Sequence, residues 1–455
     1  MEWEGKTVLV LGLGDTGLSC IRWLEKRGAR VRAADTREAP PALGEVQARH
    51  PRVEVARGAF AAALLAGVDA VAASPGVALR EPVLRAALER GIEVVGDVEI
   101  FGREVARRGT GARVLGITGT NGKSTVTALA GAMGRAAGLR TVVAGNIGLP
   151  VLDALDSPEG ERAELFVLEL SSYQLETTAS LALEAAAMLN LTQDHLDRYD
   201  SMAGYARAKE RIFAHAKTRV VNREDEWSRA MAGGERVLTF GLDVPASDSD
   251  WGLDAARARL RRGGEDLLAV DEMAMKGLHN AANALAAHAL LSAAGAPGAP
   301  LAQAIREFKG LPHRVELVAE AHGVRFYDDS KGTNVGAAVA ALEGFTAPVV
   351  LIAGGEGKGQ DFAPLAPAVK RHARAVVLIG RDAPAIARVL ASTGVAVDRA
   401  ATMEDAVAAA QARARPGDCV LLSPACASFD MFRNYGHRGE IFAAAARALA
   451  ARARD

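Results

Sequence analysis

Short apolar runs alternate with longer amphipathic stretches along most of the chain. Residues 7–11, 114–117 and 165–170 are examples of the short runs, and each is followed by a polar or glycine-rich segment. Strand-length runs separated by helix-length stretches predict parallel β-strands, because parallel strands need long crossover connections. The pattern therefore indicates an α/β fold in which helices cover the faces of the sheets.

Two breaks in the pattern divide the runs into three groups. The first is the polar, glycine-containing segment at 107–111, and the second lies near 311–314, where Pro312 would interrupt a helix. We expect three domains, at 1–108, 109–310 and 311–455. The first and last should be Rossmann-like, with doubly wound sheets. Residues 233–270 are polar, rich in glycine and irregular, and their pattern predicts no clear element.

The bulk composition narrows the class of protein. Hydrophobic residues make up 49% of the 455 positions and charged residues 24%, so the chain can build large cores. The net charge of −1 gives no reason to expect binding to nucleic acid or to an anionic membrane. No apolar run approaches the ~20 residues needed to span a bilayer, and Met1-Glu-Trp-Glu does not resemble a secretion signal. Cys20, Cys419 and Cys426 stand in unrelated contexts, so we expect them to be buried as small apolar residues in a cytoplasmic enzyme.

A glycine-rich loop separates the run at 114–117 from a helical stretch at 126–137. Small residues let backbone N–H groups approach a polyphosphate, and the helix N-terminus adds the positive end of its dipole. Lys123 supplies a positive charge for the outer phosphates, and the Ser124 hydroxyl can bind Mg²⁺. Ile117 stands where the common P-loop pattern has glycine, so an ordinary strand-to-helix turn is the alternative. We expect an ATP site in a P-loop ATPase-like central domain, formed by Gly119, Thr120, Asn121, Gly122, Lys123, Ser124 and Thr125.

A second glycine-rich loop, Gly12-Leu-Gly-Asp-Thr-Gly17, follows the first apolar run. With Asp35 after the second run, the spacing imitates a dinucleotide-binding pattern, but any nucleotide diphosphate satisfies its mechanism. Asp35, Thr36 and Arg37 are candidates for contact with a ribose or a base, and a solvated loop is the alternative. Ser74-Pro-Gly76 places a tight turn at the same edge of the predicted sheet.

Several polar groups follow the central runs. Glu169 stands where phosphate-loop enzymes hold Mg²⁺ with a second acidic element, and a carboxylate there is costly to bury unless it is paired or metal-bound. His195 could reach the same metal, although a lone histidine is more often a satisfied polar residue. Lys209 alone looks like an exposed helical lysine. Asn280 is either the N-cap of a helix through 294 or a nucleotide contact.

Two lysines stand out in the last third of the chain. Lys331 and Lys358 follow the apolar runs at 324–327 and 348–353. Cationic groups at strand ends suit recognition of a carboxylated substrate. Structural turns alone would explain the neighbouring glycines, but they do not explain both lysines.

Together these motifs resemble those of the Mur ligases of peptidoglycan synthesis, and the resemblance covers nearly the whole chain. The phosphate loop with its Ile117 is the family's own form. The run at 423–438 resembles that of members that add D-glutamate to UDP-N-acetylmuramoyl-L-alanine, and the Asp-Asn-Pro-Arg stretch typical of members adding a diamino acid is absent. Tyr173 and Gly332 are minor departures from the family pattern. Other matching motifs are Gly145-Asn-Ile-Gly148, Glu169-Leu-Ser-Ser-Tyr-Gln-Leu-Glu176, Asp194-His-Leu-Asp197, Leu311-Pro-His-Arg314 and Asp329-Ser-Lys-Gly-Thr-Asn334.

The resemblance implies a cytoplasmic, monomeric amide ligase that uses ATP to activate a carboxylate as an acyl phosphate, which the D-glutamate amine then attacks. It implies two Mg²⁺ ions, and carbon dioxide held as a carbamate on Lys209. The implied catalytic residues are Lys123, Glu169, His195 and Lys209, and the implied metal ligands are Ser124, Glu169, His195 and carbamylated Lys209.

The resemblance also assigns substrate contacts to all three domains. Beyond the phosphate loop, the implied ATP contacts are Asn280, Arg314, Asp329 and Lys331. The UDP-linked substrate would contact Gly14, Asp15, Thr16, Asp35, Thr36, Arg37, Ser74, Pro75, Gly76 and Asn146. D-glutamate would contact Thr333, Lys358, Ser428, Phe429 and Tyr435.

Three other interpretations stay open on sequence alone. Another Mur ligase or a folate polyglutamate ligase would share the ATP core but should lack Asp35-Thr-Arg37 and the element at 423–428. A dehydrogenase using residues 12–35 for NAD would leave the central phosphate loop unexplained. A nucleotide-binding regulatory protein without chemistry would not need a carboxylate, a histidine and a lysine around the phosphates.

Overall fold

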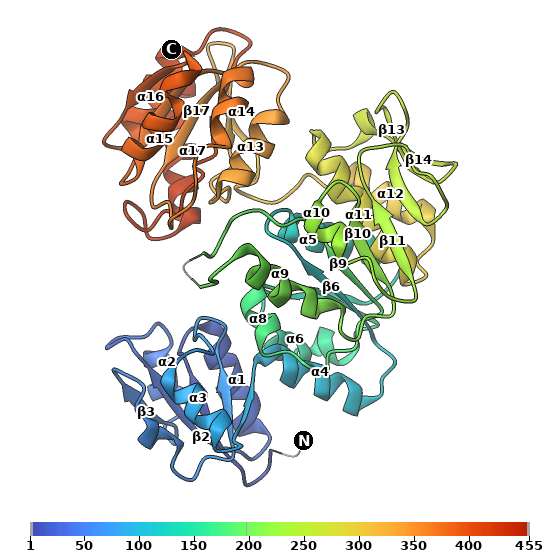
Figure 1. Cartoon of the computed structure of the whole chain (residues 1–455), viewed down its shortest axis with the longest axis vertical. Coiled ribbons are helices and arrows are strands. Elements are labelled where there is room, and N and C mark those ends of the chain that lie inside the picture. Colours follow the sequence, from blue (N-terminus) through green and yellow to red (C-terminus); the bar gives the residue numbers. More distant parts are fainter. Residues whose placement is uncertain (1–2, 197, 453–455) are drawn as a thin grey trace.

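The computed structural model describes residues 3–196 and 198–452, which form three α/β domains in chain order (Figure 1). Met1 and Glu2 of the N-terminal segment and Asp197 of the Asp194-His-Leu-Asp motif lie outside the described residues. The α/β class and the three-domain organisation predicted from the apolar pattern are confirmed.

The N-terminal domain contains a five-stranded parallel sheet with the order β3-β2-β1-β4-β5. The chain moves outward from β1 first to one side and then to the other, so the carboxyl ends of β1 and β4 form the switch point where ligands of such sheets bind. The strands are β1 (Thr7–Leu11), β2 (Arg30–Asp35), β3 (Glu54–Arg57), β4 (Ala70–Ala73) and β5 (Glu93–Val95). The helices are α1 (Asp15–Lys26), α2 (Leu43–Arg49), α3 (Pro82–Glu89) and α4 (Asp97–Arg108).

The central domain contains a nine-stranded sheet with the order β14-β13-β12-β11-β10-β9-β6-β8-β7, parallel from β7 to β12 and antiparallel beyond. Residues 233–270, for which the pattern predicted no element, contain four of these strands. The strands are β6 (Arg113–Thr118), β7 (Thr141–Gly145), β8 (Leu165–Glu169), β9 (Ala185–Met188), β10 (Arg219–Asn222), β11 (Val237–Phe240), β12 (Asp250–Leu253), β13 (Arg259–Arg262) and β14 (Glu265–Ala269). The helices are α5 (Lys123–Ala136), α6 (Val151–Asp156), α7 (Pro158–Glu161), α8 (Ser172–Glu176), α9 (Met202–Glu210), α10 (Glu226–Ala230), α11 (Leu278–Ala293) and α12 (Gly298–Glu307).

The C-terminal domain contains a six-stranded sheet with the order β15-β16-β20-β17-β18-β19, in which β15 alone runs antiparallel to its neighbour. The strands are β15 (Glu316–Ala321), β16 (Val324–Asp328), β17 (Val349–Gly354), β18 (Ala373–Ile379), β19 (Ala396–Arg399) and β20 (Cys419–Leu422). The helices are α13 (Val335–Glu343), α14 (Leu365–His372), α15 (Ala383–Leu390), α16 (Met403–Arg413) and α17 (Tyr435–Arg452).

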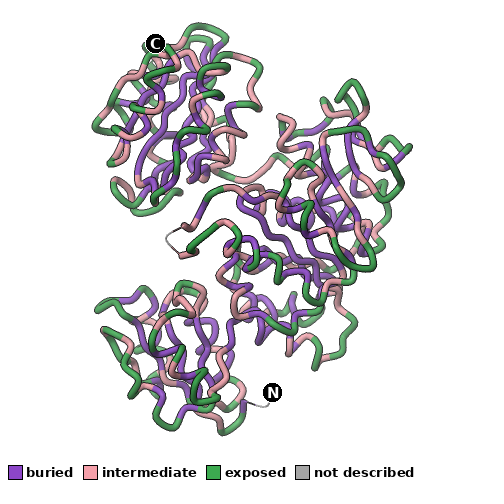
Figure 2. Tube along the Cα trace, viewed as in Figure 1, coloured by how far each residue is buried: buried purple, intermediate pink, exposed green. Residues whose placement is uncertain are grey.

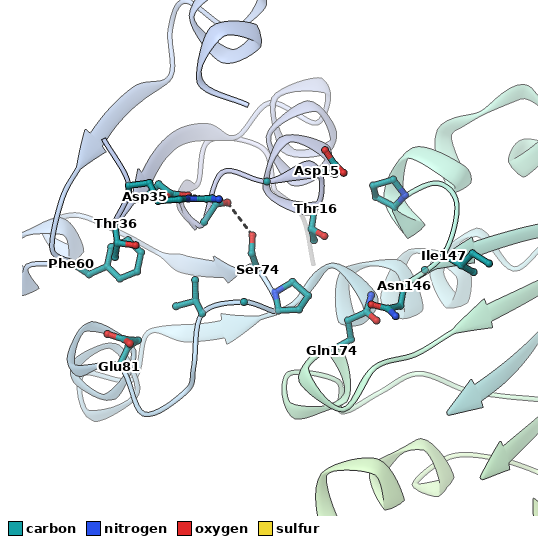
Figure 3. Close-up of a pocket in the computed structure, with 18 of the residues that line it drawn as sticks. Asp15, Thr16, Asp35, Thr36, Phe60, Ser74, Glu81, Asn146, Ile147 and Gln174 are labelled. Atoms are coloured by element: carbon teal, nitrogen blue, oxygen red, sulfur yellow. Dashed lines mark hydrogen bonds and ion pairs between the residues drawn. The ribbon is translucent and has the colours of Figure 1, made fainter. Parts of the chain in front are cut away.

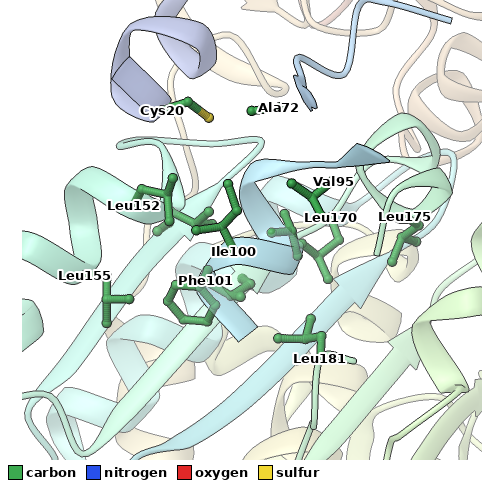
Figure 4. Close-up of a cluster of buried hydrophobic side chains, with 14 of the residues drawn as sticks. Cys20, Ala72, Val95, Ile100, Phe101, Leu152, Leu155, Leu170, Leu175 and Leu181 are labelled. Atoms are coloured by element: carbon green, nitrogen blue, oxygen red, sulfur yellow. The ribbon is translucent and has the colours of Figure 1, made fainter. Parts of the chain in front are cut away.

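Buried residues follow the strands at the centre of each domain (Figure 2). One apolar cluster continues from the N-terminal domain into the central domain (Figure 4). In it, Phe101 of α4 meets Phe166 of β8 edge to face, with ring centroids 5.2 Å apart. Such a pair stabilises by about 0.5–1.5 kcal/mol beyond its buried area. Because the two domains share this core, it holds the loops of the N-terminal sheet in position relative to those of the central sheet.

Ion pairs strengthen the same contact between domains. Asp156 at the end of α6 accepts hydrogen bonds from Arg27, directly after α1, at 3.0 and 3.1 Å and from Arg108 of α4 at 3.2 Å. Arg22 and Asp153 form a further pair between α1 and α6. These contacts bind the N-terminal sheet to the central domain through both α1 and α4.

Two predictions from composition can be compared with the fold. Cys20, Cys419 and Cys426 are all buried and unpaired, as expected. Within the described part of the chain, none of the helices is both long and apolar enough to cross a membrane.

Candidate active site between the three domains

A first cavity of about 640 Å³ lies between the N-terminal and central domains (Figure 3). All ten residues expected to contact the UDP-linked substrate line it, including Asn146 from the loop after β7. The Ser74 hydroxyl donates to the Gly12 carbonyl at 3.0 Å and joins the loops after β1 and β4. Sequence reasoning missed Phe60 and Glu81, which belong to no motif, and Gln174, which belongs to the motif at 169–176 but was given no substrate contact.

Close packing explains the glycines of the first loop. A Cβ atom on Gly17 would lie 1.9 Å from the Gly12 carbonyl oxygen, so α1 can approach the end of β1 only with glycine there. The N-terminus of α1 is thereby brought to the wall of the first cavity, where it can bind phosphate. Gly14, Asp15 and Thr16 line this wall.

Asp35 organises this loop rather than facing solvent. Its Oδ2 accepts hydrogen bonds from the Leu13 N–H at 2.7 Å and from Arg37 Nη2 at 2.7 Å. The Arg37 hydrogen bonds lower the pKa of Asp35 to about 2. The alternative of a solvated loop is therefore wrong for Asp35, although Thr36 and Arg37 are exposed and line the first cavity.

The phosphate loop connects β6 to α5. Gly122 caps α5 with a left-handed backbone (φ 82°), which glycine adopts without steric cost. The end of β9 supports the loop, because the Thr120 N–H donates to the Asn190 carbonyl (2.9 Å) and the Asn121 N–H to Asn190 Oδ1 (2.8 Å). Sequence reasoning missed Asn190, whose only signal was its place after a predicted parallel strand.

Lys123 lies over the phosphate loop. Its Nζ donates to the carbonyls of Gly119 (2.9 Å) and Thr120 (2.8 Å). Burial lowers the Lys123 pKa, while the negative charges of Glu169 and Asp194 oppose that shift. The amine is thus placed at the loop that would receive the phosphates, within electrostatic range of Glu169.

Glu169 offers a free carboxylate oxygen at the end of β8. Its Oε1 accepts a hydrogen bond from Asn146 Nδ2 at 2.7 Å, whereas Oε2 is buried and no described residue hydrogen-bonds to it. An unpaired buried carboxylate oxygen is unfavourable unless a cation binds it, and oxygen ligands are what Mg²⁺ prefers. Glu169 Oε2 therefore fits Mg²⁺, and the Ser124 hydroxyl and the His195 imidazole are the other two candidate ligands.

His195 follows β9 and has a left-handed backbone (φ 56°). Its Nδ1 lies 2.7 Å from the Tyr173 hydroxyl, and its Nε2 lies 3.7 Å from Asp194 Oδ2. Burial lowers the His195 pKa, which favours the neutral imidazole that binds metals. Asp194 also accepts a hydrogen bond from Lys358 Nζ at 2.8 Å, so the C-terminal domain contacts this loop.

Lys209 is buried, with 1% of its surface exposed, so the interpretation as an exposed lysine is wrong. Its Nζ donates to the Gly119 carbonyl at 2.8 Å and to Thr118 Oγ1 at 3.3 Å, and lies 4.8 Å from the Tyr205 ring centroid. Burial, reinforced by the positive charge of Lys123, lowers the Lys209 pKa well below its usual value. Lys209 thus brings a buried amine with a lowered pKa to the end of β6 beside the phosphate loop.

A second cavity of about 990 Å³ lies between the central and C-terminal domains. Four residues with implied ATP contacts line it together with the phosphate loop: Asn280, Arg314, Asp329 and Lys331. The N-cap of α11 is Gly277, so the alternative that Asn280 caps this helix is wrong. Ser423 donates to Asp329 Oδ2 at 2.7 Å, yet burial raises the Asp329 pKa to about 7.

The residues implied for D-glutamate follow the strands of the C-terminal sheet. Lys358 reaches Asp194, while Tyr435 lies under Lys331, whose Nζ is 3.8 Å from the ring centroid. Ser428 is buried, whereas Phe429 is 71% exposed. Thr333 and the other four described residues of this set line neither of the two cavities.

Comparison with known proteins defines the class of this three-domain site. The chain matches a Mur ligase MurD-like N-terminal domain over residues 6–96, a Mur ligase middle domain over 117–291 and a Mur ligase glutamate ligase domain over 313–426. The chain belongs to the Mur ligase family.

Several relatives of this chain share one name. Proteins from Methylobacillus flagellatus (55% identical over 97% of both chains) and Nitrosospira multiformis (54% identical over 99% of this chain and 97% of that protein) are both called UDP-N-acetylmuramoylalanine--D-glutamate ligase. UDP-N-acetylmuramate-alanine ligase MurC from Thermotoga maritima has the same fold, with a TM-score of 0.62, 19% identity and coverage of 97% of this chain and 99% of that chain. A pseudomurein peptide ligase type C from Methanothermus fervidus also has it, with a TM-score of 0.58, 18% identity and coverage of 92% and 96%.

Proposed function

We propose that this chain is an ATP-dependent ligase that joins D-glutamate to UDP-N-acetylmuramoyl-L-alanine, in a cytoplasmic step of peptidoglycan synthesis. The name shared by its relatives supports this substrate pair. The observation that carries the proposal is the position of Asn146, which lines the first cavity and also donates to Glu169 at 2.7 Å. One side chain thus connects the cavity for the UDP-linked substrate with the acid at the phosphate loop.

The chemistry requires activation of the acceptor, because a carboxylate is a poor acylating agent. An acceptor carboxylate oxygen attacks the γ-phosphorus of ATP, ADP leaves, and an acyl phosphate forms. The D-glutamate amine then attacks the acyl carbon, a proton is lost, and inorganic phosphate leaves as the amide forms. Lys123 stabilises negative charge on the phosphoryl oxygens during the first step.

Ser124, Glu169 and His195 would hold Mg²⁺. When bound, the ion withdraws negative charge from the phosphate oxygens. The free Oε2 of Glu169 supports this assignment. Arg314 must yield its hydrogen bond to Ser124 for that hydroxyl to face a cation.

Lys209 would act as a carbamate beside a second Mg²⁺. Its neutral amine adds to carbon dioxide with loss of one proton, which converts the side chain into an anion with two oxygen ligands. The burial and lowered pKa of Lys209 support this role, because only a neutral amine adds to carbon dioxide.

The C-terminal domain would supply the D-glutamate contacts through Thr333, Lys358, Ser428, Phe429 and Tyr435. The cationic Lys358 is suited to a substrate carboxylate. Asn280, Arg314, Asp329 and Lys331 would contact ATP in the second cavity. A single chain brings all three substrates together, so we propose that the enzyme acts as a monomer.

Phosphate release tests the proposal directly. We expect release from ATP to require both UDP-N-acetylmuramoyl-L-alanine and D-glutamate, in a scan across D- and L-amino acids. Release with a different amino acid instead would assign the chain to another ligase activity. Binding of NAD, monitored by protein fluorescence, with no phosphate release would support the dehydrogenase interpretation instead.

A further inference from the structure

Tyr173 holds the ring of His195 in one orientation. The Tyr173 hydroxyl lies 2.7 Å from His195 Nδ1, and the two ring centroids are 4.8 Å apart. The His195 carbonyl accepts hydrogen bonds from the backbone N–H groups of Arg198 (3.0 Å) and Tyr199 (3.1 Å). Both the backbone and the ring of His195 are therefore fixed before any ligand binds.

Arg198 fixes Tyr173 in turn. Its guanidinium carbon lies 4.4 Å from the Tyr173 ring centroid, and its Nη2 donates to Glu176 Oε2 at 2.6 Å. The same guanidinium donates to the carbonyls of Gly76 (3.5 Å) and Val77 (3.4 Å), two residues that line the first cavity. A continuous set of contacts therefore runs from the wall of the first cavity through Arg198 and Tyr173 to His195.

We propose that Tyr173 is a positioning residue that sets the tautomer of His195. An imidazole binds a divalent metal through the lone pair of one ring nitrogen, and the hydrogen bond of the other nitrogen decides which tautomer is present. In this proposal the Tyr173 hydroxyl, 2.7 Å from Nδ1, accepts the Nδ1–H of His195, which leaves the lone pair on Nε2 for the metal. This inference rests on the metal role proposed for His195 and adds the side chain that enforces it.

The chemistry of the contact explains why the hydroxyl matters and the ring alone does not. A phenylalanine at position 173 would keep the aromatic packing and the contact with Arg198 but would leave Nδ1 without its acceptor. Tyr173 is also one of the minor departures from the family pattern in this sequence, so the tautomer lock is a property of chains that carry this tyrosine.

The Tyr173→Phe variant tests the proposal through two measurements. In metal-free protein labelled with ¹⁵N-histidine, we expect His195 to be protonated on Nδ1 in the wild type and to lose that preference in the variant. The His195→Asn variant identifies the His195 signals among those of the nine histidines. In the ligase assay, the Mg²⁺ concentration for half-maximal rate should rise ~10- to 100-fold in Tyr173→Phe, with the KM for the UDP-linked substrate unchanged.

Tyr199→Phe is the matched control. Tyr199 belongs to the same aromatic cluster, with its ring 6.2 Å from that of Tyr173, and its hydrogen bond to His195 comes from the backbone. Removing its hydroxyl should change neither the tautomer nor the Mg²⁺ requirement.

The outcomes separate this inference from the proposed function. A wild-type His195 without a proton on Nδ1, or a tautomer unchanged in Tyr173→Phe, overturns the inference. So does an unchanged Mg²⁺ requirement in Tyr173→Phe beside a raised requirement in His195→Asn. An unchanged Mg²⁺ requirement in His195→Asn removes the metal role of His195 itself, and Tyr173 then has no metal ligand to position.

Discussion

Arg314 Nη2 donates a hydrogen bond to the Ser124 hydroxyl at 2.6 Å, so the segment that leads into the C-terminal domain reaches the first turn of α5. Arg314 lies between His313 and Val315, which both have a left-handed backbone (φ 61° and 51°). A positive φ is unfavourable for a β-branched residue such as Val315 and persists only where its surroundings enforce it. His313 is held by a 2.6 Å hydrogen bond to Asp328 of β16. The connection between the domains is therefore strained, and it ends on a proposed metal ligand.

We predict that the C-terminal domain closes onto the other two domains when an ATP analogue and the UDP-linked substrate bind, with the hinge at residues 311–314. Mg²⁺ at Ser124 would repel the Arg314 guanidinium, and substrates held by three domains must meet at one point. Small-angle scattering should show a smaller radius of gyration with both ligands present. Unchanged dimensions with both ligands at saturation would contradict a closing motion.

The strain at Val315 gives this motion a specific test. Glycine adopts a positive φ freely, so Val315→Gly relieves strain in the ligand-free conformation. Relief of that strain stabilises the open, ligand-free conformation relative to the closed one. The variant should therefore need more ligand than the wild type to reach the same compaction. Equal ligand requirements for the two proteins would show that the strain at Val315 does not contribute to closure.

We predict that Lys123→Ala lowers the rate of ligation ~10²–10³-fold through loss of a charge contact to the transferred phosphoryl group. Binding of the UDP-linked substrate, measured by calorimetry, should be unchanged, because the first cavity is lined by other residues. Arg37→Ala is the reciprocal variant, with weakened binding of that substrate and intact ATP binding. Parallel loss of both affinities in Lys123→Ala would contradict the separation of the two binding regions.

The elements predicted best are those whose signal lies within one short stretch of sequence. β1 coincides with the apolar run at 7–11, and β8 covers nearly all of the run at 165–170, because a short apolar run between turn residues is buried as a central parallel strand. β13 and β14 escaped prediction because they are partly exposed and carry charged side chains, some of which cover apolar side chains. The Arg262 guanidinium of β13, for example, lies 5.0 Å from the Trp251 ring centroid.

In the candidate site, too, features that depend on neighbouring residues were predicted, and features that depend on distant residues were not. The loop spacing predicted the glycine-rich turn between β6 and α5, because Gly122 and Lys123 interact with the backbone of that loop itself. The burial of Lys209 was not visible, since its hydrogen bond to Gly119 joins residues 90 positions apart in the chain. The sequence also offered Asn280 as a possible N-cap. The N-cap of α11 is instead Gly277, which has a positive φ and lies three residues earlier.

Asp329 should give the folding stability a distinctive pH dependence. Burial raises its pKa to about 7, whereas an unfolded aspartate titrates near ~4. Between these values the folded state holds more protons than the unfolded state, so the free energy of unfolding falls as pH rises. This contribution is fully present below the unfolded pKa and is lost as pH rises through about 7.

Comparison with the Asp329→Asn variant isolates that contribution from other titrating groups. Urea unfolding at about pH 5 and at about pH 8 should show that the wild type loses stability relative to the variant at the higher pH. A constant difference between the two proteins across this range would mean that Asp329 does not titrate there.

The last prediction is that Lys209 works through its carbamate. An ammonium beside Mg²⁺ would repel the metal, whereas a carbamate supplies negative charge and two oxygen ligands. Lys209→Ala should therefore be nearly inactive, and added short-chain carboxylates should restore part of the rate by occupying the vacated oxygen positions. Lys217→Ala is the matched control, because Lys217 is an exposed lysine paired with Glu184 at 2.9 Å, and its loss should cost at most ~0.5 kcal/mol in stability with activity retained. A Lys209→Ala variant with wild-type turnover in carbonate-free buffer would rule out the carbamate.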